Sequence, residues 1–407
     1  MNADPVKSSR FYSLDALRGV AALCVVFWHW QHFFYAGTKP GHVDLARLPF
    51  ERWFHLAYVR GELAVDLFFC LSGFIFYWLY ADRVSRRTIT GGHFAWLRFS
   101  RLYPLHLATL ALVAVGQRWM MKTQGCYFVY DQNDKLHFAY NLFLVSGWGV
   151  ERGFSFNGPI WSVSVEVFLY GLFFAACRLL PVRAGVLAGL AALGLVLQHA
   201  CGLALGRGML SFFTGGCVYF LYRACVRSPQ GRRLALLAGV FAAGAWVATF
   251  AAVSMAGTGD HSGGVWTAGF GPAGALVGWA VRKIGWAWPN LVLFPATILA
   301  LARGNPAGHV GASPCFSGRR FLFVVFAAFP LATGRRDRLG TQRGRCGRVL
   351  FPWIHGGVFR GFAGVGSGQL SFFRDARAAV LAALGPSAGV AGSGLAAGRR
   401  RGPRRQH

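Results

Sequence analysis

Charged residues are scarce in this chain, and acidic residues are the scarcest. Of its 407 residues, 42 are Lys or Arg and only 14 are Asp or Glu, while 55% are hydrophobic. This composition excludes a chain built only of soluble domains and is typical of a protein whose helices cross a membrane repeatedly. The net charge of +28 does not call for nucleic acid as a partner, because cytoplasmic loops of membrane proteins carry excess Lys and Arg.

Cysteine patterns that mark disulfide frameworks or metal sites are also lacking. The nine cysteines are scattered, most of them inside apolar runs, and none forms a Cys-x-x-Cys pair. We therefore expect neither disulfides nor bound zinc. No small-residue cleavage site follows the first apolar run, so we expect that run to remain as a membrane span rather than to be removed as a signal peptide.

The first apolar run, residues 11–35, is long enough to cross a bilayer as a helix. It contains Asp15, Arg18 and His29, and the last two are eleven residues apart. At this spacing they project from one helix face, roughly 16 Å apart along the axis. Ionisable groups inside a span usually face a bundle interior or a wet cavity, which makes the pair a candidate site. The alternative is that each side chain snorkels to one membrane interface.

Further apolar segments predict more helices. The expected spans after the first are residues 62–80, 102–121, 161–180, 184–202, 206–222, 234–256, 264–281 and 287–302. The apolar piece at 137–148 is too short to cross, and we expect it to be re-entrant or packed on the surface. The predicted fold is therefore an all-α, polytopic transmembrane helix bundle of about 9–10 spans.

Basic residues between the expected spans predict the orientation. The segment 82–101, expected as a loop, carries five arginines against one aspartate, and the segments 178–183 and 223–233 are basic as well. The positive-inside rule places all three in the cytoplasm. The amino terminus is then also cytoplasmic, and 122–160 lies outside. We expect a multi-pass protein of the inner (cytoplasmic) membrane.

Four sequence blocks, in order, resemble the acyltransferase-3 family of membrane enzymes, which O-acylate bacterial surface and secreted carbohydrates. They are SLDALRGVAALCVVFWHW, AVDLFFCLSGFIF, WLRFSRLYPLH and IWSVSVEVFLYGLFF, with a weaker match at SFFTGGCVYF. The family's Arg-x10-His motif is matched by Arg18 and His29, and its Arg-x-x-Arg pair by Arg98 and Arg101. Its acidic residue in the fourth block is matched by Glu166. The resemblance covers about residues 11–302.

The resemblance implies transfer of an acyl group, in the simplest case acetyl, from acyl-CoA to a carbohydrate hydroxyl. Acyl-CoA is a co-substrate here, and no bound cofactor is expected. The transfer needs a base for the hydroxyl proton and stabilisation of the developing negative charge. His29 is the natural base, because imidazole titrates near neutrality. Glu166 or Asp66 could orient it or accept a proton, but each also has a structural explanation, a helix-start carboxylate for Glu166 and a buried ion pair for Asp66.

Three arginines are the candidates for binding the donor. Arg18 lies too far along its helix to touch His29 and could hold the polar end of acyl-CoA. Arg98 and Arg101, on the cytoplasmic side, suit phosphate oxygens, as the resemblance also implies. Plain positive-inside topology would equally account for the last two. A second function class also stays open, a transporter or flippase whose buried charges line a path.

The composition changes after Arg303. No Lys follows Lys283, no Glu follows Glu166, and Arg, Gly and Ala dominate. A segment resembling GxxSYxxYLxH, which the family usually carries in this region, is not found. The expected domains are a cytoplasmic tail at 1–10, a membrane-embedded acyltransferase-3 domain at 11–303, and an Arg/Gly/Ala-rich region at 304–407. That last region is interpreted either as a basic, disordered cytoplasmic tail or as the product of a shifted reading frame.

The predicted orientation can be checked with reporter fusions. A reporter joined after Arg87 or Arg227 should report cytoplasm, and one joined at Gln132 should report the outside, because the basic segments on either side stay in the cytoplasm. Paired alkaline phosphatase and green fluorescent protein fusions measure this. A cytoplasmic signal at Gln132 would contradict the predicted arrangement of spans.

Overall fold

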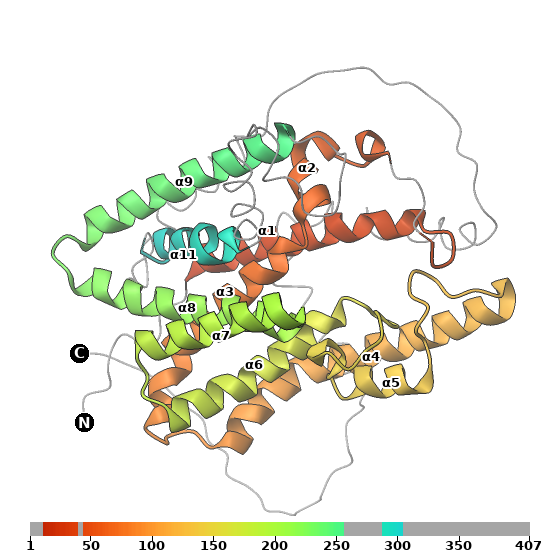
Figure 1. The fold of residues 1–407 in the computed structure, drawn as a ribbon, viewed down its shortest axis with the longest axis horizontal. Coiled ribbons are helices and arrows are strands. Elements are labelled where there is room, and N and C mark those ends of the chain that lie inside the picture. The colour runs from red at the N-terminus through yellow and green to blue at the C-terminus, as the bar shows by residue number, and fades with distance from the viewer. Residues whose placement is uncertain (1–10, 40–43, 256–286, 304–407) are drawn as a thin grey trace, which may run out of the picture. The chain divides into compact units, whose positions relative to one another are not determined.

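The computed structural model describes residues 11–39, 44–255 and 287–303. These residues form helices and no β-strand, which confirms the all-α class (Figure 1). The elements in chain order are α1 (Tyr12–His29), η2 (Trp30–Phe34), η3 (Leu45–Arg47), α2 (Glu51–Arg60), α3 (Leu63–Ser85), α4 (Gly91–Gln124), α5 (Lys135–Leu142), η4 (Ser146–Trp148), α6 (Ile160–Leu179), α7 (Ala184–Cys201), α8 (Ala204–Arg227), α9 (Gly231–Met255), η7 (Pro289–Leu293) and α11 (Phe294–Arg303).

Six helices of the described residues, α3, α4, α6, α7, α8 and α9, are long and apolar enough to cross a membrane, which confirms a polytopic bundle. Helix α1 is not one of the six, because Asp15, Arg18 and His29 lower its hydropathy, although η2 continues it to Phe34. The segment expected as a span at 287–302 is a shorter apolar helix, formed by η7 and α11. The expected span at 264–281 and the region 304–407 lie outside the described residues.

Several helices expose large apolar side chains. On α4, Leu105 is 70% exposed and Leu112 is 73% exposed, and on α7 Val196 is 58% exposed. On α9, Leu236 is 68% exposed. Extended apolar faces of this kind are unfavourable in water and are stable against lipid chains. The arrangement of the side chains therefore agrees with a bundle surrounded by a bilayer.

Helices α3 and α8 approach each other closely through glycines. Gly73 of α3 lies against the backbone of Phe212, and Gly215 of α8 lies against the backbone of Cys70. A Cβ atom at either glycine would overlap a backbone carbonyl, so larger residues would push the helices apart. The two glycines therefore set the close packing of α3 and α8.

A cluster of aromatic rings joins α3, α4, α6 and α8. The Phe76 ring stacks on Tyr170 at 4.8 Å and meets Phe173 edge-on at 5.3 Å and Phe212 at 5.7 Å. Phe94 of α4 lies 6.0 Å from Phe173. Aromatic pairs contribute about 0.5–1.5 kcal/mol each beyond the area they bury. The cluster therefore holds the first turns of α4, which carry two of the candidate arginines, against α3 and α6.

The loop expected at 82–101 is mostly helical. Helix α3 extends to Ser85 and α4 begins at Gly91, so only residues 86–90 connect them. Thr90 caps α4, its hydroxyl accepting a hydrogen bond from the backbone N–H of His93 at 3.3 Å. The apolar pattern predicted a span from residue 102, but the helix already begins at Gly91 and Pro104 lies inside it. The prediction of a long loop was wrong because the cap, and not the apolar run, sets where α4 begins.

The segment 36–61, which separates the first two expected spans, contains helix α2. Phe27 of α1 stacks on Phe54 at 4.3 Å and meets Tyr58 at 5.2 Å, so that α2 packs along α1. The sequence of α2 is polar enough to resemble a loop. Its aromatic residues form a helix face only when α1 is present to receive them.

The apolar piece at 137–148 does not cross the bilayer. It forms the short helix α5 and the single turn η4, which confirms that part of the prediction. The expectation of no disulfide was wrong, because Cys126 is disulfide-bonded. Cys126 belongs to no Cys-x-x-Cys pair, so no spacing pattern in the sequence marks it as a disulfide cysteine.

The contact between α3 and α8 generates a stability prediction. Gly73→Ala should destabilise the protein by about 1–3 kcal/mol, because the added methyl group overlaps the Phe212 carbonyl. Gly116→Ala in α4 is the matched control, since nothing lies within 4 Å of its Cβ position. Thermal unfolding of both variants in detergent measures the difference. Equal transition temperatures would contradict the close contact.

Candidate functional site

Two arginines and two carboxylates from three helices gather near the first turns of α1. The Nη1 of Arg18 lies 3.4 Å from the Oδ1 of Asp15. Arg18 also interacts electrostatically with Arg101 of α4 and with Glu166 of α6. The structure thus brings together three of the candidate residues, Arg18, Arg101 and Glu166. Two guanidinium groups held close to each other favour a bound anion, which relieves their mutual repulsion.

Arg98 is held by aromatic side chains. Its Nη2 donates a hydrogen bond to the Tyr80 hydroxyl at 2.7 Å, and its guanidinium lies 5.0 Å from the Tyr80 ring centroid and 5.3 Å from that of Phe76. The Tyr170 ring is 6.0 Å away. These are cation–π distances. Arg101, by contrast, is exposed and makes no hydrogen bond to the described residues. The two arginines of the pair therefore have different surroundings.

Glu166 is the α6 member of the group formed by Asp15, Arg18, Arg101 and Glu166, which we call the arginine cluster. Its Oε1 accepts hydrogen bonds from the Tyr170 hydroxyl at 2.6 Å and from the Ser72 hydroxyl at 3.3 Å. Since Tyr170 also lies beside Arg98, the carboxylate and both arginines of α4 share one environment. Within the described residues, no hydrogen bond joins Glu166 to His29. Its position links α6 to α3 at the Arg18 end of α1.

His29 ends α1, at the opposite end from Arg18. Its Nδ1 lies 2.8 Å from the carbonyl oxygen of Val25. Because a carbonyl can only accept, Nδ1 carries a proton. In a neutral imidazole ring the lone pair is then on Nε2, which is the form a general base requires. The His29 ring lies 5.3 Å from His32, which lies 5.2 Å from Tyr35 and 5.9 Å from Tyr130.

The surroundings of His29 include a tyrosine that stays protonated. Burial raises the pKa of Tyr130 to about 12, so its hydroxyl remains a hydrogen-bond donor at neutral pH. Helix α1 runs without a break from Tyr12 to His29. Arg18 and His29 are therefore about 16 Å apart along the axis, as the sequence predicts. The structure contains two separate groups of polar residues, one at each end of α1.

Asp66 is paired with an arginine that the sequence analysis did not single out. Arg207 of α8 donates to both carboxylate oxygens of Asp66, at 2.7 and 2.8 Å, and to the carbonyl of Glu62 at 3.0 Å. Its guanidinium also lies 5.4 Å from the Trp161 ring. Asp66 is only 1% exposed. This geometry is that of a buried ion pair between α3 and α8, the structural alternative considered for Asp66.

Arg207 could have been noticed in the sequence. It stands between two glycines at the start of an apolar run, where an unpaired charge would be costly. A buried arginine in such a run requires a carboxylate partner, and few are available in so acid-poor a chain. The sequence does not say which of them is the partner, because 141 residues separate Arg207 from Asp66.

A second polar network connects α4, α5 and the segment before α6. The Nδ2 of Asn141 donates to the Ser155 hydroxyl at 2.8 Å, which donates to Glu151 at 2.8 Å. His106 of α4 meets the carbonyl of Asn141 at 2.8 Å. Burial raises the pKa of the Glu151 carboxyl. The buried positions of these groups indicate that they hold the short elements together.

Metal binding has no evident place in the described part of the chain. There, no three side chains of His, Cys, Asp or Glu are grouped so that they could hold a metal ion.

Two known proteins are similar to parts of this chain. The chain is 42% identical over 105 residues to protein 2 in the picA locus of Rhizobium radiobacter, a match that covers 26% of this chain and 44% of that protein. It is 33% identical over 186 residues to the acyltransferase MdmB of Streptomyces mycarofaciens, covering 44% of this chain and 43% of MdmB. The chain thus matches less than half the length of each relative. No solved structure matches it significantly.

The family match covers far more of the chain. The acyltransferase domain that defines the acyltransferase-3 family matches residues 11–303, which include all the candidate residues described above. The matched region begins just before α1 and ends at the last residue of α11. Since most of the sequence lies within this match, the chain belongs to the acyltransferase-3 family.

Proposed function

We propose that this protein is a membrane O-acyltransferase that moves an acyl group, in the simplest case acetyl, from acyl-CoA to a carbohydrate hydroxyl. The observation that carries the proposal is the hydrogen bond from His29 Nδ1 to Val25, which leaves Nε2 as an acceptor at the end of a helix that also bears Arg18. Membership of the family supports acyl transfer. One relative, MdmB, is named an acyltransferase.

The arginine cluster is the proposed site for the polar end of the donor. Acyl-CoA carries its phosphates at one end and its thioester at the other, and the two ends of α1 offer matching chemistry. Arg18 and Arg101 would bind phosphate oxygens, because guanidinium groups form charge-assisted, often bidentate bonds to them. The roughly 16 Å between Arg18 and His29 along α1 then leaves room for the arm that connects phosphate and thioester.

The proposed reaction uses His29 as the base. The acceptor hydroxyl attacks the thioester carbonyl carbon and gives its proton to Nε2 of His29. The new C–O bond forms as the C–S bond breaks, and the proton passes from His29 to the departing thiolate of CoA. A positioned base of this kind typically contributes about two to four orders of magnitude in rate.

The remaining candidates receive supporting roles in this proposal. Glu166 orients Arg18 electrostatically. It also accepts a hydrogen bond from Tyr170, which holds that side chain near the proposed donor-binding arginines. Asp66 keeps α3 and α8 in register through Arg207. Arg98 positions Tyr80 and Tyr170 rather than touching the donor. The location in the inner membrane and the cytoplasmic amino terminus remain predictions, and they would place the arginine cluster on the side where acyl-CoA is made.

The role of His29 can be tested by substitution in the full chain. His29→Gln should lower the rate of acetyl-CoA consumption in membranes by at least a hundredfold, because the base is lost. His93→Gln is the matched control, since His93 is exposed near the start of α4 and its side chain makes no hydrogen bond there. Both proteins should reach the membrane in equal amounts. A loss below tenfold in His29→Gln would argue against the assignment of the base.

The two arginines of α4 should respond differently. Arg101→Ala should raise the KM for acetyl-CoA by about tenfold or more, since a hydrogen bond to a charged group contributes about 1.5–3 kcal/mol. Saturating acetyl-CoA should then restore most of its rate. Arg98→Ala should instead lower the unfolding temperature, because it removes the Tyr80 hydrogen bond and the ring contacts. The reverse pattern would overturn the division of roles.

A further inference from the structure

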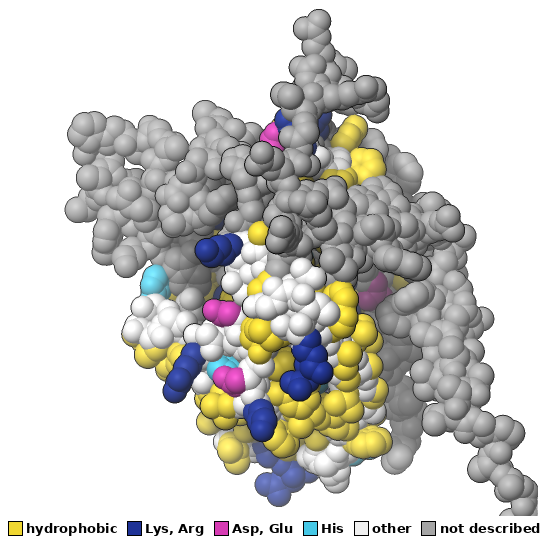
Figure 2. All heavy atoms as spheres, turned by 90° about the vertical axis from the view of Figure 1, so that its right-hand side faces the viewer, with side chains coloured by type: hydrophobic (Ala, Val, Ile, Leu, Met, Phe, Trp, Pro, Cys, Tyr) yellow, Lys and Arg dark blue, Asp and Glu magenta, His cyan; other side chains and the backbone are white. Residues whose placement is uncertain are grey.

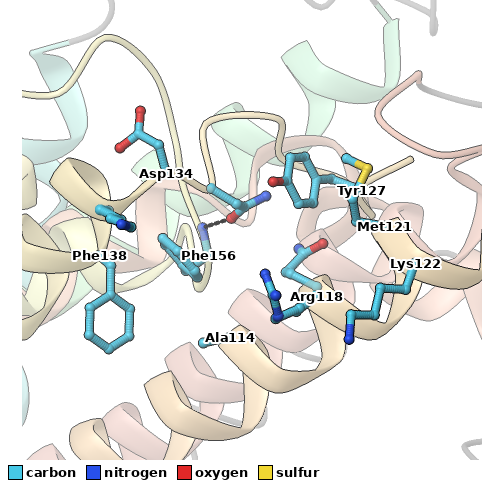
Figure 3. Close-up of a pocket in the computed structure, with 11 residues that line it drawn as sticks. Ala114, Arg118, Met121, Lys122, Tyr127, Asp134, Phe138 and Phe156 are labelled. Carbon is cyan, nitrogen blue, oxygen red and sulfur yellow. Dashed lines mark hydrogen bonds between the residues drawn. The ribbon is translucent and has the colours of Figure 1, made fainter. Parts of the chain in front are cut away.

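A cavity of about 300 Å³ lies between the last turns of α4 and the segment 127–138 (Figure 3). Arg118 and Lys122 of α4 and Lys135 at the start of α5 line it, and Asp134 is the one carboxylate in the lining. We call it the α4 cavity. The acyl transfer proposed above does not use it.

The basic residues of the α4 cavity have no partners in the described part of the chain. Arg118, Lys122 and Lys135 make no hydrogen bond or ion pair there, whereas Asp134 is occupied by His137, whose backbone N–H and Nδ1 both lie 2.8 Å from its Oδ1. Three cations and one carboxylate give the lining a net charge of +2. Figure 2 shows the side of the molecule where α4 ends and α5 lies, with basic side chains among hydrophobic ones.

Membrane topology does not account for these cations. Arg101 and Arg118 are seventeen residues apart on α4, about 25 Å along the axis, which nearly equals the thickness of the hydrocarbon core of about 30 Å. The two therefore lie near opposite interfaces. The positive-inside rule explains the arginines near Arg101, on the expected cytoplasmic side, and it gives no reason for a basic group at the other interface.

Aromatic side chains form part of the cavity wall, and hydrogen bonds hold the adjoining segment against α4. Tyr127, Phe138 and Phe156 line it. The side-chain amide of Gln117 closes two hydrogen bonds with the backbone of Phe128, at 2.8 and 2.9 Å, which ties the segment to α4. Such a preformed pocket, with aromatic walls and a few convergent charged groups, has the usual character of a small-molecule site.

The α4 cavity is also connected to the surroundings of His29. Asn133, which lines the cavity, accepts from the backbone N–H of Phe156 at 2.7 Å and donates to the carbonyl of Tyr130 at 2.7 Å. The Tyr130 ring in turn lies 5.9 Å from His32, the neighbour of His29. Tyr130 and His32 therefore stand between the cavity and His29.

We propose that the α4 cavity binds the phosphate group of a molecule at the membrane surface, with the apolar part of that molecule against the aromatic walls. The net charge of the lining matches a phosphate monoester, whose charge is close to −2 at neutral pH. Arg118 supplies a planar fork and the two lysines supply mobile charges, a combination that suits phosphate oxygens. The phosphate can be carried by a saccharide or by a lipid headgroup, and the proposal does not depend on the acyl transfer.

The test measures binding to the purified full chain. Calorimetric titration with glucose 6-phosphate, compared with glucose, probes a sugar phosphate. Thermal unfolding in phosphatidylcholine nanodiscs that contain phosphatidic acid, compared with phosphatidylcholine alone, probes a lipid headgroup that is a phosphate monoester. The Arg118→Gln, Lys122→Gln double variant should bind the responding probe at least tenfold more weakly. Arg152→Gln is the matched control, an exposed cation of the same region that does not line the cavity, and it should bind normally.

A second variant, which is expected to bind the probe more tightly, tests the proposal even if the double variant misfolds. Asp134→Asn removes the one carboxylate of the lining while asparagine still caps α5, so it should bind the same probe severalfold more tightly. A response to glucose 6-phosphate would identify a sugar phosphate, and a response to phosphatidic acid a lipid headgroup. Binding of neither probe, equal loss in Arg152→Gln, or no gain in a folded Asp134→Asn protein would overturn the proposal.

Discussion

The close contact of α3 and α8 is the constraint on which the rest of the described structure depends. Gly73 and Gly215 remove the side chains that would keep the two backbones apart, and the Asp66–Arg207 pair lies in the same interface. Helix α3 also contacts α1, α6 and α11. Because association in a bilayer relies on close packing rather than on the hydrophobic effect, small residues at this interface decide whether the other helices have a surface to pack on.

The polar residues near α1 follow from that packing. Ser72, next to Gly73, donates to Glu166, and Glu166 lies close enough to Arg18 for electrostatic interaction. Phe76, on the same helix, stacks with Tyr170 and lies beneath Arg98. The arginine cluster is thus assembled on α3 even though its members come from α1, α4 and α6. Charged groups in a low-dielectric interior need such fixed partners to be stable.

Helix α4 connects two basic regions that would otherwise seem unrelated. Its 34 residues extend about 51 Å, well beyond the hydrocarbon core of about 30 Å, so both of its ends reach the interfaces. The end near Arg101 belongs to the arginine cluster, and the end near Arg118 lines the α4 cavity. A single rigid element therefore relates the two positions across the membrane.

Apolar length and basic loops were enough to predict a polytopic helical bundle, and the spacing of Arg18 and His29 was enough to place them at two ends of one helix. These features can be predicted from the sequence because helix geometry is local and periodic. The beginning of α4 and the existence of α2 could not be predicted from the apolar pattern. Thr90 acts as a cap only in its local conformation, and α2 depends on Phe27 for its packing surface.

The sequence by itself determined the helical class, the family resemblance and the identity of the candidate side chains. Only the tertiary structure decided their partners: Asp66 with Arg207, Arg98 among three aromatic rings, Glu166 with Ser72, and three cations around one cavity that have no ion-pair partner among the described residues. The physical reason is that the first three of these contacts join residues on different helices, up to 141 positions apart. Their distances depend on how the helices pack, and no local pattern in the sequence records that packing.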